Sequence, residues 1–255
     1  MQDSSWGGTP SKYILKSIFR WSAIGRESVS KQYPGGERLK LKYLCKDLKG
    51  FMQLVTYLVS RGYYYHCVII LPEKKRDKFE SIDKKLIDKY AADKSKYQRS
   101  RQKIKKQANF YYLRLENLAI LLHTEGDISE YPNDDKFKDI RVKNGKLTLP
   151  FSDYLKLDVV LVEEKEDRPK VAVKMSPEMY AGVKDSLHDC VLSKKIGLVY
   201  AEFNKLYGLP GYAGLIKQEQ ALLRFTLNQC AKHQLIINQS KFRINTFKNT
   251  TKVFE

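Results

Sequence analysis

The sequence predicts an α+β fold in which β-hairpins of an antiparallel sheet pack against amphipathic helices. Three observations support this expectation: apolar residues recur at helical spacing, aromatic and β-branched runs alternate with turn residues, and the C-terminal region has a helical pattern. The chain has 255 residues and 42% of them are apolar, enough for one large or two small domains. We expect a basic α/β region over 1–128 and a hairpin-plus-helix region over 139–255, or one continuous domain.

The first half of the chain is expected to alternate helices with strands. A helix is expected over 44–61, where apolar residues share one face and a cation followed by glycine ends the pattern. A buried strand is expected over 63–71, because this run is aromatic and β-branched and stops at a proline. Two more strands are expected within 109–122, separated by a turn near Glu116 and Asn117.

One long basic helix is expected near residues 78–107. Apolar residues at helical spacing mark its first half, namely Phe79, Ile82, Leu86 and Tyr90. Beyond Asp93 the apolar stripe thins, and only Tyr97 and Ile104 continue it. The second half of this helix therefore has little apolar surface to bury against a core.

The second half of the chain is expected to hold two hairpins followed by helices. Asn144-Gly145 is a strong hairpin signal, and a charged turn separates the strands of the second hairpin. The expected strand pairs are 139–143 with 146–150 and 157–162 with 170–175. Ser176-Pro177-Glu178 opens a helix with a capping serine, a proline at the first helical position and an early acid. Further helical segments are expected, at 196–207 and 215–235.

The charge of the chain predicts the class of its partner. Lys and Arg number 47 and Asp and Glu number 29, which gives a net charge of +18. Such a charge favours a polyanionic binding partner, because each phosphate that a cation neutralises releases counterions. We expect nucleic acid, with RNA slightly favoured over DNA, and protein partners within a complex. No membrane partner is expected, because no stretch approaches the roughly 18 uncharged apolar residues of a membrane span.

The cysteines and the first residues bear on the cellular compartment. Cys45, Cys67, Cys190 and Cys230 include no C-x-x-C pair, which argues against a zinc ribbon and a disulfide framework. The segment 1–8 lacks the basic-then-apolar layout of a signal peptide. We therefore expect an intracellular protein, cytoplasmic or nucleoid-associated and not secreted.

A one-sided run of charge is the most distinctive feature of the sequence. Seven cations and no acid occur in thirteen residues, namely Lys94, Lys96, Arg99, Arg101, Lys103, Lys105 and Lys106. A solvated helix is usually stabilised by acids four residues from its cations, and here none is available. A phosphate backbone along the helix would relieve the repulsion between like charges, so we expect these residues to contact nucleic acid.

Tyrosines lie next to this basic run. Tyr97, Tyr111 and Tyr112 are close to the cations in the sequence and are expected to stack on unpaired bases. The alternative is that these rings belong to the core, with their hydroxyls reaching the surface.

A metal-dependent nuclease or nicking enzyme is the alternative function. His66 lies in a tyrosine-rich strand, as in nucleases that combine metal-binding histidines with a nucleophilic tyrosine, although no second histidine lies two positions away. Glu163 and Lys165 form a Glu-x-Lys pattern at the end of an apolar strand, with Asp139 or Asp153 as a further metal ligand. The competing interpretation is that Glu163 and Lys165 belong to a charged hairpin turn.

The leading hypothesis is a non-catalytic protein that binds structured RNA or a single strand. It would be the protein component of a ribonucleoprotein or a mobile-element complex. No phosphate-binding glycine loop, serine elbow or zinc-protease motif occurs, so we expect no cofactor, and Mg²⁺ only for the nuclease alternative. A third hypothesis is a basic assembly subunit that contacts an acidic protein.

Overall fold

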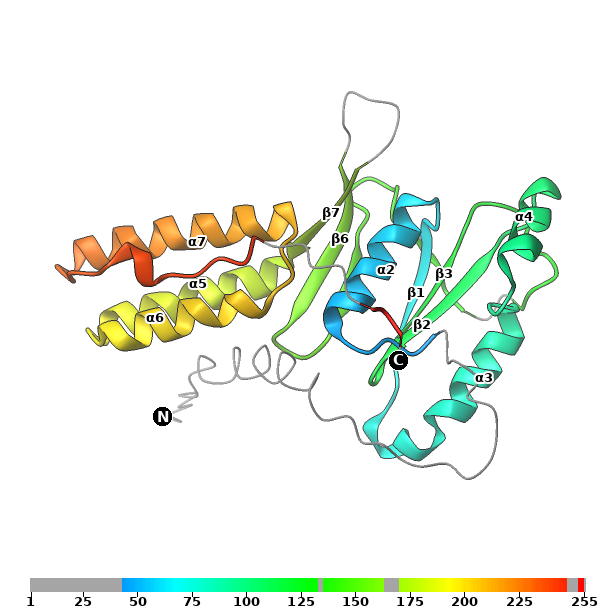
Figure 1. Ribbon diagram of the computed structural model, residues 1–255, viewed down its shortest axis with the longest axis horizontal. Coiled ribbons are helices and arrows are strands. Elements are labelled where there is room, and N and C mark those ends of the chain that lie inside the picture. The colour runs from blue at the N-terminus through cyan, green and yellow to red at the C-terminus, as the bar shows by residue number, and fades with distance from the viewer. Residues whose placement is uncertain (1–42, 133–134, 163–169, 247–251, 255) are drawn as a thin grey trace, which may run out of the picture. The chain divides into compact units, whose positions relative to one another are not determined.

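The structure is a computed structural model that describes residues 43–132, 135–162, 170–246 and 252–254 (Figure 1). It confirms the α+β class, because two antiparallel sheets are packed with helices. The chain divides into two compact units. The sheet unit contains the described residues of 43–149, 158–172 and 252–254, and the helical unit contains 150–157 and 173–246. Strands β6 (Lys156–Val162) and β7 (Lys170–Met175) contribute residues to both units.

The larger sheet has the strand order β2-β3-β1-β4 and belongs to the sheet unit. Strands β2 and β3 form a tight hairpin, in which Glu116 has a positive φ of 51° and Leu115 pairs with Leu118. Strand β1 pairs antiparallel with β3 and continues the sheet to β4. The turn expected near Glu116 and Asn117 is therefore confirmed. The strands are β1 (Tyr65–Ile70), β2 (Phe110–Leu115), β3 (Leu118–His123) and β4 (Lys138–Asp139).

Helices α2 (Leu48–Ser60) and α3 (Phe79–Tyr90) both pack against β2. The Asp47 carboxylate accepts from the Gly50 backbone N–H and caps α2 at its start. The last residue of α3, Tyr90, joins a buried cluster with Phe110 and Tyr112. Because side chains alternate along a strand, Tyr111 faces the opposite side of the sheet from Phe110 and Tyr112.

The prediction of a single long helix near 78–107 is wrong, because the structure contains two helices separated by a turn (Figure 1). Helix α3 ends at Tyr90, because the next residue, Ala91, has a left-handed φ of 45° that breaks the helical path. Helix α4 (Lys96–Ile104) begins after Ser95, whose hydroxyl accepts from the Gln98 N–H while the Gln98 side chain accepts from the Ser95 N–H. A short 3₁₀ segment, η3 (Glu73–Lys78), precedes α3.

The prediction of a hairpin at Asn144-Gly145 is wrong as well, although the tight turn itself forms. Asn144 has a φ of 60°, and the Gly145 N–H donates to the Val142 carbonyl. A Cβ on Gly145 would lie 2.4 Å from the Ile140 carbonyl oxygen, so this turn requires glycine. The flanking strands nevertheless enter different sheets, because β4 pairs with β1 while β5 (Leu147–Pro150) pairs with β6.

The second expected strand pair is present as neighbours in the three-stranded sheet β5-β6-β7. Its strands are β6 (Lys156–Val162) and β7 (Lys170–Met175). The intervening turn lies outside the described residues. Buried Asp158 accepts from the Lys146 ammonium and the Thr148 hydroxyl, at 2.8 and 2.7 Å.

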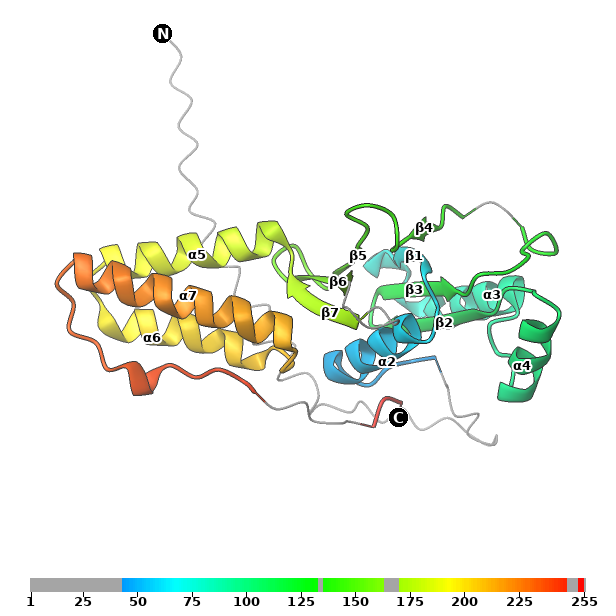
Figure 2. The same cartoon turned by 90° about the horizontal axis from the view of Figure 1, so that it is seen from above.

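The helical unit contains α5, α6 and α7, of which α5 packs against both of the others (Figure 2). Ser176 caps α5 by accepting from the Met179 N–H, and Pro177 is its first residue, as expected. The Gln218 amide bonds both the N–H and the carbonyl of Met175, which ties α7 to the end of β7. The bounds are α5 (Pro177–Leu192), α6 (Ile196–Asn204), η4 (Lys205–Gly208), α7 (Ala213–Lys232) and η5 (Gln239–Lys241).

Candidate nucleic-acid interface

Helix α4 lies at the end of the four-stranded sheet where β2 begins, and none of its residues is buried (Figure 1). Two side-chain hydrogen bonds attach it to the rest of the sheet unit. The Asn109 amide donates to the Arg99 carbonyl at 3.1 Å, and the Gln102 amide donates to the Tyr131 hydroxyl at 3.4 Å. One side of the helix thus contacts the sheet unit, and the rest of its surface is exposed to solvent.

The seven cations of the basic run lie on or beside α4, and most are exposed. Lys94 is partly buried because its ammonium donates to the Tyr131 hydroxyl at 2.8 Å and lies 5.5 Å from the centre of that ring. Within the described part of the chain, no salt bridge joins any of the seven to a carboxylate. Their positive charge is therefore not neutralised by these parts of the protein.

The outward face of α4 combines an apolar stripe with cations on both sides. Tyr97 and Ile104 are 81% and 80% exposed and lie seven residues apart, so they share one side of the helix. At about 100° per residue, Lys96 and Lys103 lie to one side of this stripe and Arg101 to the other. An exposed ring with cations on both sides can contact a base and its neighbouring phosphates together.

Tyr111 supports one of these cations. The Arg99 guanidinium lies 5.1 Å from the centre of the Tyr111 ring, and Tyr63 packs edge-on against the same ring at 6.2 Å. Burial raises the pKa of Tyr111, while the positive charge of Arg99 lowers it. Tyr111 is thus half-buried beneath a guanidinium, a contact that the sequence analysis did not anticipate.

Tyr112, which was expected to stack on an unpaired base, is instead a core residue. Its ring is only 2% exposed, and its hydroxyl donates to the buried Asp83 carboxylate at 2.6 Å. Burial raises the pKa of Tyr112, and the negative charge of Asp83 raises it further. No face of this ring is open to a base, because the alternation of the strand directs it into the core beneath α3.

Of the residues of the nuclease alternative, His66 and Asp139 lie on described strands, and these two face opposite sides of the sheet. Asp139 pairs across the strands with Tyr65, whereas His66 is the next residue along β1 and so faces the other side. His66 is buried, and burial lowers its pKa to about 4. Glu163 and Lys165 lie outside the described residues.

Asp139 belongs to an ion-pair cluster centred on Arg141, which the sequence analysis missed. The Arg141 guanidinium bonds both oxygens of Asp139, reaches Glu125 at 3.3 Å and donates to the Tyr65 hydroxyl at 2.7 Å. Arg141 holds the pKa of Asp139 below its usual range. The Tyr65 ring also stacks on His123 at 4.6 Å. Arg141 in this cluster is paired with two carboxylates, whereas the cations of α4 have no carboxylate partner among the described residues.

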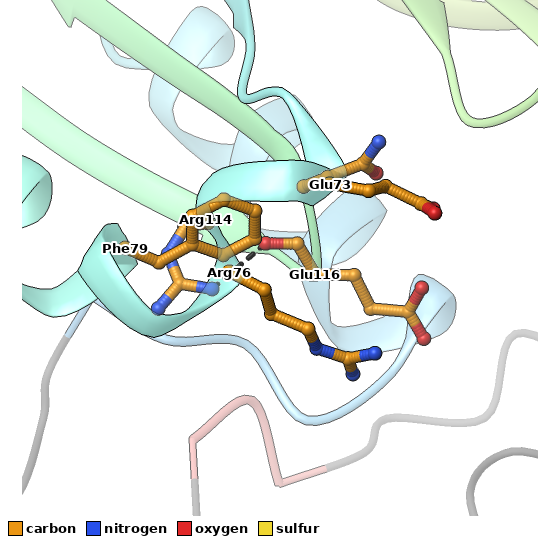
Figure 3. A pocket seen from close by; sticks show the side chains of 6 residues that line it. Glu73, Arg76, Phe79, Arg114 and Glu116 are labelled. Carbon is orange, nitrogen blue, oxygen red and sulfur yellow. Dashed lines mark hydrogen bonds between the residues drawn. The ribbon is translucent and has the colours of Figure 1, made fainter.

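A separate pocket of about 210 Å³ lies near the turn between β2 and β3 (Figure 3). Arg114 lies in its wall and donates to the Glu116 carbonyl at 2.7 Å, while the Phe79 ring lies 5.3 Å from its guanidinium. The other lining residues are Glu73, Arg76 and Asn117. The lining has both signs of charge, so this pocket lacks the uniformly positive character of α4.

No group of three or more histidine, cysteine or acidic side chains among the described residues could hold a metal ion. None of the described helices is long and apolar enough to cross a bilayer. Comparisons with protein-family models, curated proteins and solved structures gave no match to this sequence.

Proposed function

We propose that this protein binds nucleic acid through α4 and acts as the protein component of a ribonucleoprotein or mobile-element complex. The observation that supports this proposal most strongly is the outward face of α4, where exposed Tyr97 lies between cations that no described carboxylate neutralises. Phosphates bound at Lys96, Arg101 and Lys103 would release counterions and remove the repulsion between these side chains.

The exposed ring favours a strand with unpaired bases as the ligand. A duplex contacted only through its phosphates would leave the Tyr97 ring without a partner, whereas the ring can stack on any unpaired base. Structured RNA with loops and single-stranded nucleic acid both provide such bases. The phosphate contacts position the strand and carry no sequence information. We therefore propose binding with little base specificity and a strong dependence on salt.

The experiment is a titration of binding affinity against salt for the wild type and a charge-reversed variant. Arg101→Glu with Lys103→Glu should weaken binding to a labelled single strand and flatten the log-log salt dependence. The expected change in slope is at least about 0.7 per lost phosphate contact. The matched control is Lys84→Glu with Lys85→Glu, which makes the same change in charge at two exposed positions of α3.

The two variants distinguish a local contact from a general effect of net charge. If α4 is the interface, the α4 variant loses much more affinity than the α3 control while both keep the wild-type melting temperature. Equal losses in the two variants would mean that net charge alone attracts the strand, and the proposed interface would be wrong.

A further inference from the structure

A second exposed tyrosine lies with an arginine at the C-terminal end of α2. Tyr57 is 53% exposed, and the Arg61 guanidinium lies 5.3 Å from the centre of its ring. Arg61 is the C-cap residue of α2 and is exposed to solvent. No salt bridge of the described residues includes Arg61. This pair therefore has the same two components as the face of α4, an accessible ring and an unneutralised cation.

Tyr63 connects this pair to α4. It lies three residues after the end of α2 and is only 9% exposed, and its ring packs edge-on against Tyr111, over which the Arg99 guanidinium of α4 lies. Burial raises the pKa of Tyr63 and of Tyr111, Arg99 lowers both, and the nearby Tyr57 phenol raises both. The Tyr63 backbone N–H donates to the Leu58 carbonyl at 3.2 Å, so Tyr63 lies against the last turn of α2, which contains Tyr57. Together the three tyrosines form a tyrosine row, made up of Tyr57, Tyr63 and Tyr111, with a guanidinium at each end.

We propose that the tyrosine row extends the interface of α4, so that one single-stranded segment contacts α4 and then stacks a base at the Tyr57–Arg61 pair. This inference depends on the proposed function of α4 and specifies its ligand as a single strand rather than a duplex. Two guanidinium groups along the row match a phosphate backbone in charge. The exposed ring at its far end matches an unpaired base, because stacking needs only an open π-face.

The chemistry of the row favours nucleic acid over an acidic protein segment. Carboxylates would pair with Arg61 and Arg99 but would leave the Tyr57 ring unused. A nucleotide strand uses both features, because bases and phosphates alternate along it. A guanidinium next to a ring also provides a second planar surface on which a base can stack.

The test measures affinity for a single strand of about 16 nucleotides, a length at the upper end of a typical single-strand site. Tyr57→Ala should weaken binding by about five- to 150-fold, whereas Tyr57→Phe should retain it because the ring remains. Arg61→Gln should weaken binding and reduce the salt slope by about 0.7. The matched control is Tyr207→Ala, which removes a ring that is 47% exposed in the helical unit.

Three further measurements separate the possible outcomes. A duplex of the same length should bind Tyr57→Ala and the wild type equally. If the wild type binds this duplex more tightly than the single strand, the inference is overturned. If Arg101→Glu with Lys103→Glu weakens binding but the Tyr57 and Arg61 variants match Tyr207→Ala, the tyrosine row is wrong and the function of α4 stands. If an acidic peptide displaces the strand from wild type but not from Arg61→Gln, the row is a protein-binding surface and the inference also fails.

Discussion

The guanidinium of Arg114 and the carboxylate of Asp83 form a bidentate ion pair inside the sheet unit. Arg114 Nε lies 2.9 Å from both carboxylate oxygens, and Nη2 lies 2.8 Å from Oδ2. Asp83 is fully buried, and Tyr112 donates a further hydrogen bond to it. This network joins α3 to β2, so it fixes the element from which the chain turns toward α4.

The first prediction is that Asp83→Ala destabilises the protein by about 3–5 kcal/mol, because it leaves the Arg114 charge buried without a counterion. The double variant Asp83→Leu with Arg114→Met should be more stable than the single variant, since it removes both charges together. Urea denaturation of the three proteins provides the measurement. A single variant as stable as the wild type would show that the pair does not hold α3 in place.

The second prediction concerns Glu219, which is 1% exposed in α7 and has a carboxylate oxygen without a hydrogen-bond partner among the described residues. Burial raises its pKa to about 8. The folded state therefore binds the proton more tightly than the unfolded state, whose Glu has a pKa near 4.5. This residue contributes stability that is fully present below pH 4.5 and is lost as the pH rises toward 8, with a slope of at most about 1.4 kcal/mol per pH unit.

Glu219→Gln should remove this pH dependence, because the amide does not titrate. The free energy of unfolding from urea titrations between pH 5 and 8 should fall less steeply in the variant than in the wild type. His66 has a lowered pKa and contributes the opposite slope at acid pH, so the comparison uses the difference between the two proteins. Parallel curves for wild type and variant would show that Glu219 does not retain its proton in the folded state.

The third prediction separates binding from cleavage. Labelled single- and double-stranded substrates incubated with Mg²⁺ or Mn²⁺ should remain intact, because Asp139 is already paired with Arg141 and faces away from His66. The measurement is gel analysis of the products. Cleavage that disappears in Glu163→Ala while affinity persists would favour the nuclease alternative.

The fold class and most elements were predictable because they depend on local pattern. The strand at β1 and the cap of α5 at Ser176 follow from residue types within a few positions. The break between α3 and α4 was missed because helical periodicity continues across Ala91 to Tyr97. Ser95 and Gln98 carried the signal of a new helix, a serine followed three residues later by glutamine.

The candidate site was predictable in its charge but not in its aromatic contacts. The cations of α4 are visible in the sequence because no acid interrupts them. Which of two adjacent strand tyrosines faces the core depends on the helix that covers that face, so the burial of Tyr112 could not be inferred locally. The stacking of Arg99 on Tyr111 and the row that reaches Tyr57 likewise join segments distant in sequence.

The last prediction distinguishes these tyrosines by experiment. Tyr97→Ala should weaken binding of a single strand by about five- to 150-fold and leave the melting temperature unchanged, because the ring is 81% exposed. Tyr112→Ala should instead cost about 3–5 kcal/mol of stability, as truncation of a buried aromatic side chain does. Affinity and thermal unfolding measured on the same preparations separate the two effects. If Tyr97→Ala binds like the wild type while Arg101→Glu with Lys103→Glu does not, α4 contacts phosphates alone and the bases lie elsewhere.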